Sequence, residues 1–269
     1  MTIKLVAIDI DGTLLDSNRN ITARVKEAVQ KANKQGVFIV LCTGRPLPGV
    51  KSLLEELNLY RDNDYVITYN GSLVQATKSK EVISKYTLSY TDFLEIELEA
   101  RKVGSHLHMS DEQNIYTFNR DIGKYTVHEA YLVDMPLKYR SVEEITPDIN
   151  VIKMMMIDEP KILDHSISQL PSSLKEKYTT VKSTEFYYEI LNKEASKGNA
   201  LEKLAAHLNI PIEETMAIGD NENDLSMIEK AGIGVAMGNA TENVKNAADV
   251  HTSSNDEDGV AEVLFKYLN

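Results

Sequence analysis

Two aspartates separated by one residue, Asp9 and Asp11, follow an apolar run near the start of the chain, within the segment Asp9 to Thr13. Alternate residues of a strand leave on the same side, so the two carboxyl groups face one region. Close carboxylates repel each other unless a cation or a shared proton relieves the repulsion. A solvated Asp-Gly turn is the structural alternative. Two aspartates that end a buried strand favour a chemical role instead.

A second acidic cluster, Gly219 to Asp224, also follows an apolar run and therefore also ends an expected strand. If the two strands are neighbours, Asp220 converges with the first pair of aspartates. Carboxylate and carbonyl oxygens with room for water suit Mg²⁺, whereas zinc would favour His or Cys. The alternative is an acidic helix start, because Asp224 suits the positive end of a helix dipole.

Two further fragments have the chemistry of a phosphate site. Thr43, Gly44 and Arg45 follow the expected second strand and offer a hydroxyl, backbone N–H groups and a helix N-terminus to an anion. Lys197 opens a later helix and supplies an ammonium group. A lone Thr or Lys is usually a cap or a surface residue. Four such fragments at strand or helix ends together indicate a site.

The elements that must position these residues alternate between short apolar runs and helical periodicity, which is typical of a parallel sheet covered by helices. Thr22 is placed as a helix N-cap. In the first seventy residues, the pattern predicts strands at 3–8, 37–41 and 65–68 and helices at 23–34 and 46–57. Late in the chain it predicts helices at 199–208, 224–231, 241–247 and 259–268 and strands at 215–218 and 233–236.

The middle of the chain differs from both flanks. Its expected strands, 114–118, 151–157, 181–183 and 186–190, are separated by helical stretches such as 90–103 and 161–170. Right-handed crossovers join the two flanks into one sheet. The predicted fold is therefore an α/β, Rossmann-like doubly wound parallel sheet formed by residues 1–82 and 194–269, with an inserted α+β cap domain at 83–193.

Composition excludes several classes of protein. The 269 residues include 29 Lys and Arg against 41 Asp and Glu, a net charge of −12, which argues against nucleic-acid binding. No uncharged apolar stretch reaches the roughly 18 to 20 residues that span a bilayer, and no signal peptide is expected, so we expect a cytoplasmic protein that does not bind membranes. A single cysteine, Cys42, excludes disulfides and motifs that need two thiols.

The four fragments, in this order, resemble the haloacid dehalogenase superfamily of phosphohydrolases. The matching motifs are DxDGT at Asp9 to Thr13, the threonine of Thr43-Gly44-Arg45, the lysine of Lys197-Gly198 and GDxxND at Gly219 to Asp224. The large α/β insertion between the second and third motifs is similar to the Cof-type branch, whose members often act on sugar phosphates.

The resemblance implies a Mg²⁺-dependent phosphatase that hydrolyses small phosphate monoesters through an aspartyl-phosphate. Asp9 is the implied nucleophile, and Asp11 the implied acid and base. The implied metal-binding residues are Asp9, Asp11 through its backbone carbonyl, Asp220 and Asp224, the last orienting the metal's water shell or Lys197. The implied phosphate- and substrate-binding residues are Gly12, Thr43, Gly44, Arg45, Lys197 and Asn223.

Two alternatives stay open at this point. A phosphomutase shares the aspartyl-phosphate and differs only in the fate of that intermediate. A signalling receiver domain also gathers aspartates, a Thr and a Lys around Mg²⁺, but receivers are short and have no inserted cap. Substrate specificity is expected from the cap, and Asn70-Gly71, at the end of the third expected strand, could also reach the substrate.

Overall fold

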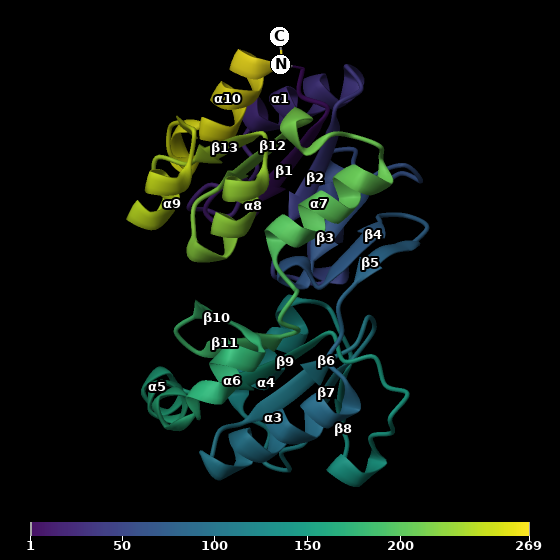
Figure 1. The fold of residues 1–269 in the computed structure, drawn as a ribbon, viewed down its shortest axis with the longest axis vertical. Helices are drawn as coiled ribbons and strands as arrows, with labels where there is room; N and C mark the ends of the chain where they lie inside the picture. The colour runs from purple at the N-terminus through teal and green to yellow at the C-terminus, as the bar shows by residue number, and fades with distance from the viewer. Residues whose placement is uncertain (1, 269) are drawn as a thin grey trace. The chain divides into compact units, whose positions relative to one another are not determined.

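The computed structural model describes residues 2–268 and divides the chain into two compact units. The first unit comprises the chain up to Lys85 and again from Ser196 onwards, and the second comprises Tyr86–Ala195. The chain therefore leaves the first unit and returns to it (Figure 1). No helix within residues 2–268 is long and apolar enough to cross a membrane.

The first unit is a sheet between helices. Its strands are β1 (Leu5–Asp9), β2 (Phe38–Cys42), β3 (Tyr65–Thr68), β4 (Leu73–Ala76), β5 (Val82–Lys85), β12 (Thr215–Gly219), β13 (Ile233–Ala236) and β14 (Val250–His251). Its helices are α1 (Ala23–Lys34), α2 (Lys51–Glu56), α7 (Lys197–His207), α8 (Leu225–Lys230), α9 (Glu242–Ala247) and α10 (Gly259–Tyr267).

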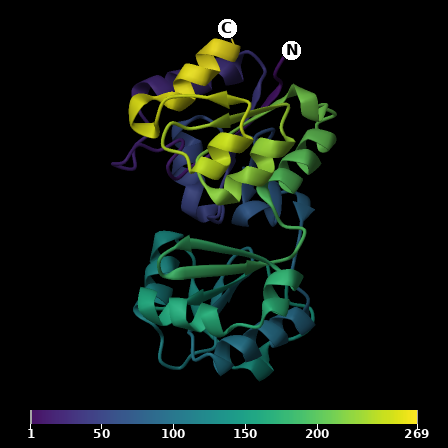
Figure 2. The ribbon, with the colours of Figure 1, turned by 60° about the vertical axis from the view of Figure 1, so that its left-hand side comes forward.

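The strand order of this sheet is β14-β13-β12-β1-β2-β3-β4-β5, and the strands from β14 to β3 are parallel. β1 is buried along its whole length because side chains cover both faces of the sheet. Val6 and Ile8 pack with residues of α1 and α10, and Leu5 and Ala7 pack with residues of α7. The helices accordingly lie on both sides of the sheet (Figure 2).

The second unit has its own mixed sheet in the order β10-β11-β9-β6-β7-β8. Its strands are β6 (Leu107–Ser110), β7 (Ile115–Thr117), β8 (Leu137–Tyr139), β9 (Lys153–Ile157), β10 (Thr179–Thr184) and β11 (Tyr187–Leu191). Its helices are α3 (Tyr90–Lys102), α4 (Lys124–Leu132), α5 (Pro160–Gln169) and α6 (Ser172–Lys177). Residues of α3, α5 and α6 pack with Met154 and Met156 of β9 in one apolar cluster.

The predicted fold class is confirmed: a parallel α/β sheet carries a second, mixed α/β unit as an insertion. Helix α1 begins after Thr22 as predicted, because the Thr22 hydroxyl accepts a hydrogen bond from the backbone N–H of Val25 at 3.2 Å. The single helix predicted at 46–57 is wrong. A 3₁₀ turn at Pro48–Val50 precedes α2, and the backbone of Val50 is not helical at the junction. The antiparallel hairpin of β4 and β5 was not predicted.

Candidate active site

The acidic residues lie at one edge of the parallel sheet. β1 pairs with β12 in parallel, with Ile8 opposite Ile218, so the two strands end side by side. Asp9 ends β1, and Asp220 directly follows β12. Ligand sites of open α/β sheets form at the carboxyl ends of the strands. They lie where the chain continues from two neighbouring strands to helices on opposite faces of the sheet.

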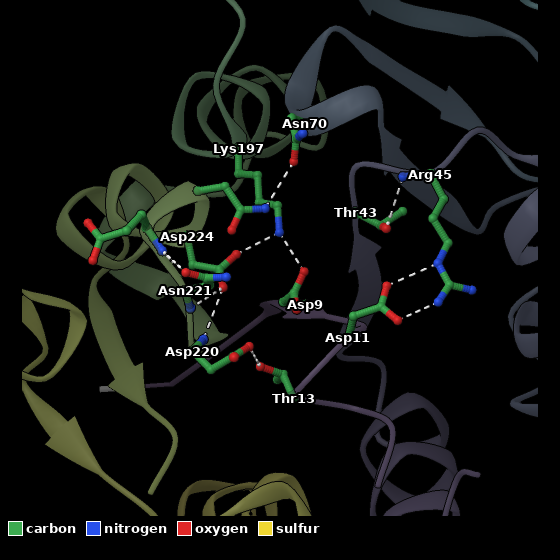
Figure 3. Close-up of polar contacts among 12 residues, drawn as sticks. Asp9, Asp11, Thr13, Thr43, Arg45, Asn70, Lys197, Asp220, Asn221 and Asp224 are labelled. Carbon is green, nitrogen blue, oxygen red and sulfur yellow. Dashed lines mark hydrogen bonds and ion pairs between the residues drawn. The ribbon is translucent and has the colours of Figure 1, made fainter. Parts of the chain in front are cut away.

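Asp9, Asp220 and Asp224 form one cluster of carboxylates (Figure 3). One carboxylate oxygen of each residue lies within 4.8 Å of the corresponding oxygens of the other two. Asp9 and Asp224 are buried, and Asp220 is partly buried. Three carboxylates at this separation can hold one cation through hard oxygen ligands, which is the donor set of Mg²⁺ and not of zinc.

Lys197 is the cation that the chain itself supplies to this cluster. Its Nζ lies 2.5 Å from Oδ1 of Asp9 and 2.6 Å from Oδ1 of Asp224, and its side chain is completely buried. Burial alone would lower the pKa of Lys197, but the charges of Asp224 and Asp9 outweigh this effect and raise it. The two carboxylates therefore favour the charged form of the ammonium group.

Asp224 is held in place by backbone groups. Its Oδ2 accepts hydrogen bonds from the N–H groups of Asp220 at 2.9 Å and Asn221 at 3.1 Å, while its Oδ1 faces Lys197. This is the capping box of the short 3₁₀ helix Glu222–Asp224. A Cβ at Gly219 would lie 2.6 Å from Cβ of Asp224, so the glycine is needed for this close approach.

Asp220 is fixed by the loop that follows β1. The hydroxyl of Thr13 donates a hydrogen bond to Oδ1 of Asp220 at 2.8 Å. A Cβ at Gly12, whose φ is +85°, would lie 2.5 Å from Oδ2 of Asp220, so only glycine fits there. Burial and the neighbouring Asp224 raise the pKa of Asp220 to about 6, against the opposing hydrogen bond from Thr13.

The charge balance of the cluster fits a bound cation. Burial, and next the charge of Asp224, hold the pKa of Asp9 well above its usual value even though Lys197 opposes the shift. Three acidic groups thus share one ammonium group in a poorly hydrated place. A divalent cation among these oxygens would offset the excess negative charge, and so the residues present fit a metal ion.

Asp11 lies differently from the other aspartates. Arg45 donates two hydrogen bonds to its carboxylate, one from Nε to Oδ2 at 3.0 Å and one from Nη2 to Oδ1. The side chain of Asp11 is 55% exposed, and its carboxyl group is not in the cluster that Asp9, Asp220 and Asp224 form. The sequence resemblance assigns only the backbone carbonyl of Asp11 to a metal, so this placement does not conflict with it.

The remaining residues of the predicted phosphate site come from the neighbouring loops. Thr43 is buried directly after β2, and its hydroxyl accepts a hydrogen bond from the backbone N–H of Arg45 at 3.1 Å. Asn223 Nδ2 donates to Oδ1 of Asn70 at 3.0 Å. A Cβ at Gly44 would lie 3.0 Å from Nδ2 of Asn70. These loops all belong to the first unit of the chain.

One residue of this network had no predicted role. Thr13 belongs to the DxDGT motif, but its contact with Asp220 joins positions 207 residues apart. Only the pairing of β1 with β12 brings the two together. No local pattern in the sequence could have indicated that partner.

Comparisons with known proteins agree with this geometry. The profile of the haloacid dehalogenase-like hydrolases matches residues 6–264. A putative phosphatase of Streptococcus pyogenes is 51% identical over 268 residues, covering 100% of this chain and 99% of that protein. The structure of a haloacid dehalogenase-like hydrolase from Bacteroides thetaiotaomicron, 34% identical, has a TM-score of 0.86 over 98% of this chain and 99% of that one.

A solved structure of a sugar phosphatase of subclass IIB is 28% identical, with a TM-score of 0.80 over 98% of each chain. The family, the branch and the fold suggested by the sequence are thereby confirmed. The chain therefore belongs to the haloacid dehalogenase-like hydrolase family and is a phosphatase of its Cof-type branch.

Proposed function

We propose that this phosphatase is Mg²⁺-dependent and hydrolyses small phosphorylated metabolites, sugar phosphates in particular, through an aspartyl-phosphate on Asp9. The observation that carries the proposal is the cluster of Asp9, Asp220 and Asp224, in which Asp9 and Asp224 also hold the buried ammonium group of Lys197. A carboxylate nucleophile and a divalent-metal site meet at that cluster.

In the first step a carboxylate oxygen of Asp9 attacks phosphorus, and the bond between phosphorus and the alcohol oxygen breaks. The departing alkoxide takes a proton from the carboxyl group of Asp11. The side chain of Asp11 is open to solvent, whereas that of Asp9 is buried, and Asp11 has to leave its ion pair with Arg45 to carry the proton. The products are a phosphoryl group on Asp9 and a free alcohol.

In the second step a water molecule attacks phosphorus and gives a proton to Asp11, and the bond between phosphorus and Asp9 breaks. Inorganic phosphate leaves, and both aspartates return to their starting state. Thr43, Lys197 and Asn223 hold the phosphoryl oxygens. Gly12, in the loop after β1, and Gly44 and Arg45, in the loop after β2, lie beside them. One Asp11 carboxyl group thus serves as acid and then as base.

Mg²⁺ bound by the Asp9 and Asp220 carboxylates and the Asp11 backbone carbonyl would supply electrostatic stabilisation of the phosphoryl oxygens. The fold would keep these metal ligands at fixed positions and shield them from water. Asp224 does so indirectly, since it fixes Lys197 and the backbone of Asp220 and Asn221.

Sugar phosphates are the favoured substrate class because the subclass IIB relative described above is a sugar phosphatase. The motif residues contact only the phosphoryl group and the metal, so residues outside the motifs must select the leaving group. The test is phosphate release from a panel of phosphorylated sugars, nucleotides and pyridoxal phosphate. Hydrolysis confined to nucleotides or to pyridoxal phosphate would refute the sugar-phosphate assignment.

A further inference from the structure

Three consecutive residues after β3, namely Tyr69, Asn70 and Gly71, have positive φ angles of 51°, 53° and 94°. All three are buried. Positive φ is unfavourable for residues with a Cβ, and above all for a bulky residue such as tyrosine. Such a run persists only where the surrounding contacts hold it in place, and these conformations concentrate at functional sites.

The left-handed turn, residues 69–71, holds the loop that follows β2. The backbone N–H of Asn70 donates to the carbonyl of Thr43 at 2.9 Å, and that of Tyr69 donates to the carbonyl of Arg45 at 3.3 Å. The side-chain amide of Asn70 lies against Gly44, where an added Cβ would be 3.0 Å from Nδ2. The turn therefore fixes one segment of the predicted phosphate site.

The same turn contacts two more segments of that site. A Cβ at Gly71 would lie 2.1 Å from the carbonyl oxygen of Ser196, so the turn packs directly on the residue before Lys197. Oδ1 of Asn70 accepts a hydrogen bond from Nδ2 of Asn223 at 3.0 Å. Figure 3 shows Asn70 on the same side of the site as Lys197. Three segments that are far apart in the sequence thus meet at one turn.

We propose that Asn70 is a positioning residue for phosphate binding, which it serves by orienting the side-chain amide of Asn223. The inference rests on the proposed function, in which Asn223 holds a phosphoryl oxygen. A side-chain amide has two N–H groups. Asn70 takes one of them and so fixes the plane of the Asn223 amide, which leaves the second for an oxygen of the ligand. The left-handed turn keeps Asn70 at the required position.

The test is Asn70→Gly. Glycine adopts positive φ readily, so the turn keeps its backbone while the side-chain acceptor is lost. The measurements are the dissociation constant of inorganic phosphate by calorimetry in MgCl₂, and kcat and KM for p-nitrophenyl phosphate. The dissociation constant and KM are expected to rise by about tenfold, because the Asn223 amide is no longer oriented and its hydrogen bond to the charged ligand weakens. The melting temperature is expected to stay within a few degrees.

Asn58→Gly is the matched control, because Asn58 has a φ of 59° but lies exposed after α2. It is expected to leave phosphate binding unchanged. In the double variant, Asn70→Gly should add little to the loss that Asn223→Ala causes alone, since the amide that Asn70 orients is then already absent. An Asn70→Gly protein that binds phosphate like its parent, or losses that multiply in the double variant, would overturn the inference. Absence of hydrolysis by a parent that binds phosphate would refute the proposed function alone.

Discussion

The ammonium group of Lys197 lies 2.6 Å from Oδ1 of Asp224, and neither side chain is exposed to solvent. Lys197 also faces Asp9, so one buried cation contacts two buried carboxyl groups from distant parts of the chain. Removing one partner of a buried ion pair leaves an uncompensated charge and costs more than the pair itself contributes. The acidic cluster is therefore also a structural element of the sheet edge.

Lys197→Met is expected to lower the free energy of unfolding by about 3 to 5 kcal/mol. Methionine has nearly the same side-chain volume as lysine, so the lost free energy of unfolding measures the effect of the missing charge. Adding Asp224→Asn to this variant should restore part of the stability, because it removes one of the stranded carboxylates. Urea denaturation of the three proteins measures both effects. A Lys197→Met protein as stable as its parent would show that the pair contributes nothing.

Asp9→Asn is expected to reduce phosphatase activity by on the order of a thousandfold or more while the chain stays folded. The amide has almost the shape of the carboxyl group but is not a nucleophile. Asp62→Asn is the control, since Asp62 is 71% exposed and forms a surface ion pair with Lys78. Steady-state hydrolysis and circular dichroism check the two halves of the prediction. Near-normal rates in Asp9→Asn would end the assignment of the nucleophile.

Removal of divalent cations is expected to stop hydrolysis, and added MgCl₂ to restore it, because three acidic groups otherwise share one ammonium group. Asp220→Asn should raise the Mg²⁺ concentration for half-maximal activity by about tenfold or more. Glu222→Gln is the control in the same loop, since Glu222 is exposed and its side chain contacts Thr241 and Asn243. Full activity in EDTA would contradict the charge argument.

The inserted unit should lose stability in acid because of His108. This histidine is completely buried, and neither ring nitrogen has a hydrogen-bonding partner among the described residues. Burial, with a smaller effect of Lys153, lowers the pKa of His108 to about 3. In the unfolded chain the imidazole of His108 therefore takes up a proton near pH 6.5, whereas in the folded chain it stays neutral. The free energy of unfolding consequently has its full value above pH 6.5 and falls as the pH drops towards 3.

His108→Leu removes this titration. Between about pH 7.5 and about pH 4.5, the parent should lose roughly 2 to 3 kcal/mol more stability than the variant. Other titrating groups are common to both proteins and cancel in the comparison. Denaturant unfolding at the two pH values measures the difference. Parallel losses in parent and variant would show that His108 is protonated in the folded chain or titrates unchanged.

The residues with strong local patterns were predictable. Apolar runs and helical spacing located β3 and α1 with the bounds that the structure shows, because buried parallel strands and amphipathic helices leave clear periodicities. The hairpin of β4 and β5 was not predicted, because β5 is short and partly exposed and its composition resembles that of a loop. Edge strands of this kind carry little periodic signal.

The features of the site also divide into those that could be predicted from the sequence and those that could not. The motifs singled out Asp9 and Asp220, and the pairing of β1 with β12 brings these two residues together. The sequence could not show that Arg45 binds the side chain of Asp11, since a contact across 34 positions depends on the path of the loop after β2. The positive φ of Tyr69 likewise leaves no trace in residue type.

The Asp11→Asn variant offers the sharpest test of whether Asp9 carries the phosphoryl group. Without the acid and base, the intermediate should form slowly and be hydrolysed more slowly still. The variant is mixed with p-nitrophenyl phosphate and MgCl₂, quenched in acid, digested with pepsin and examined by mass spectrometry. We predict one phosphoryl group on the peptide that contains Asp9, and on Asp9 itself. A phosphoryl group on any other residue, or turnover by Asp11→Asn as fast as the parent's, would contradict the account.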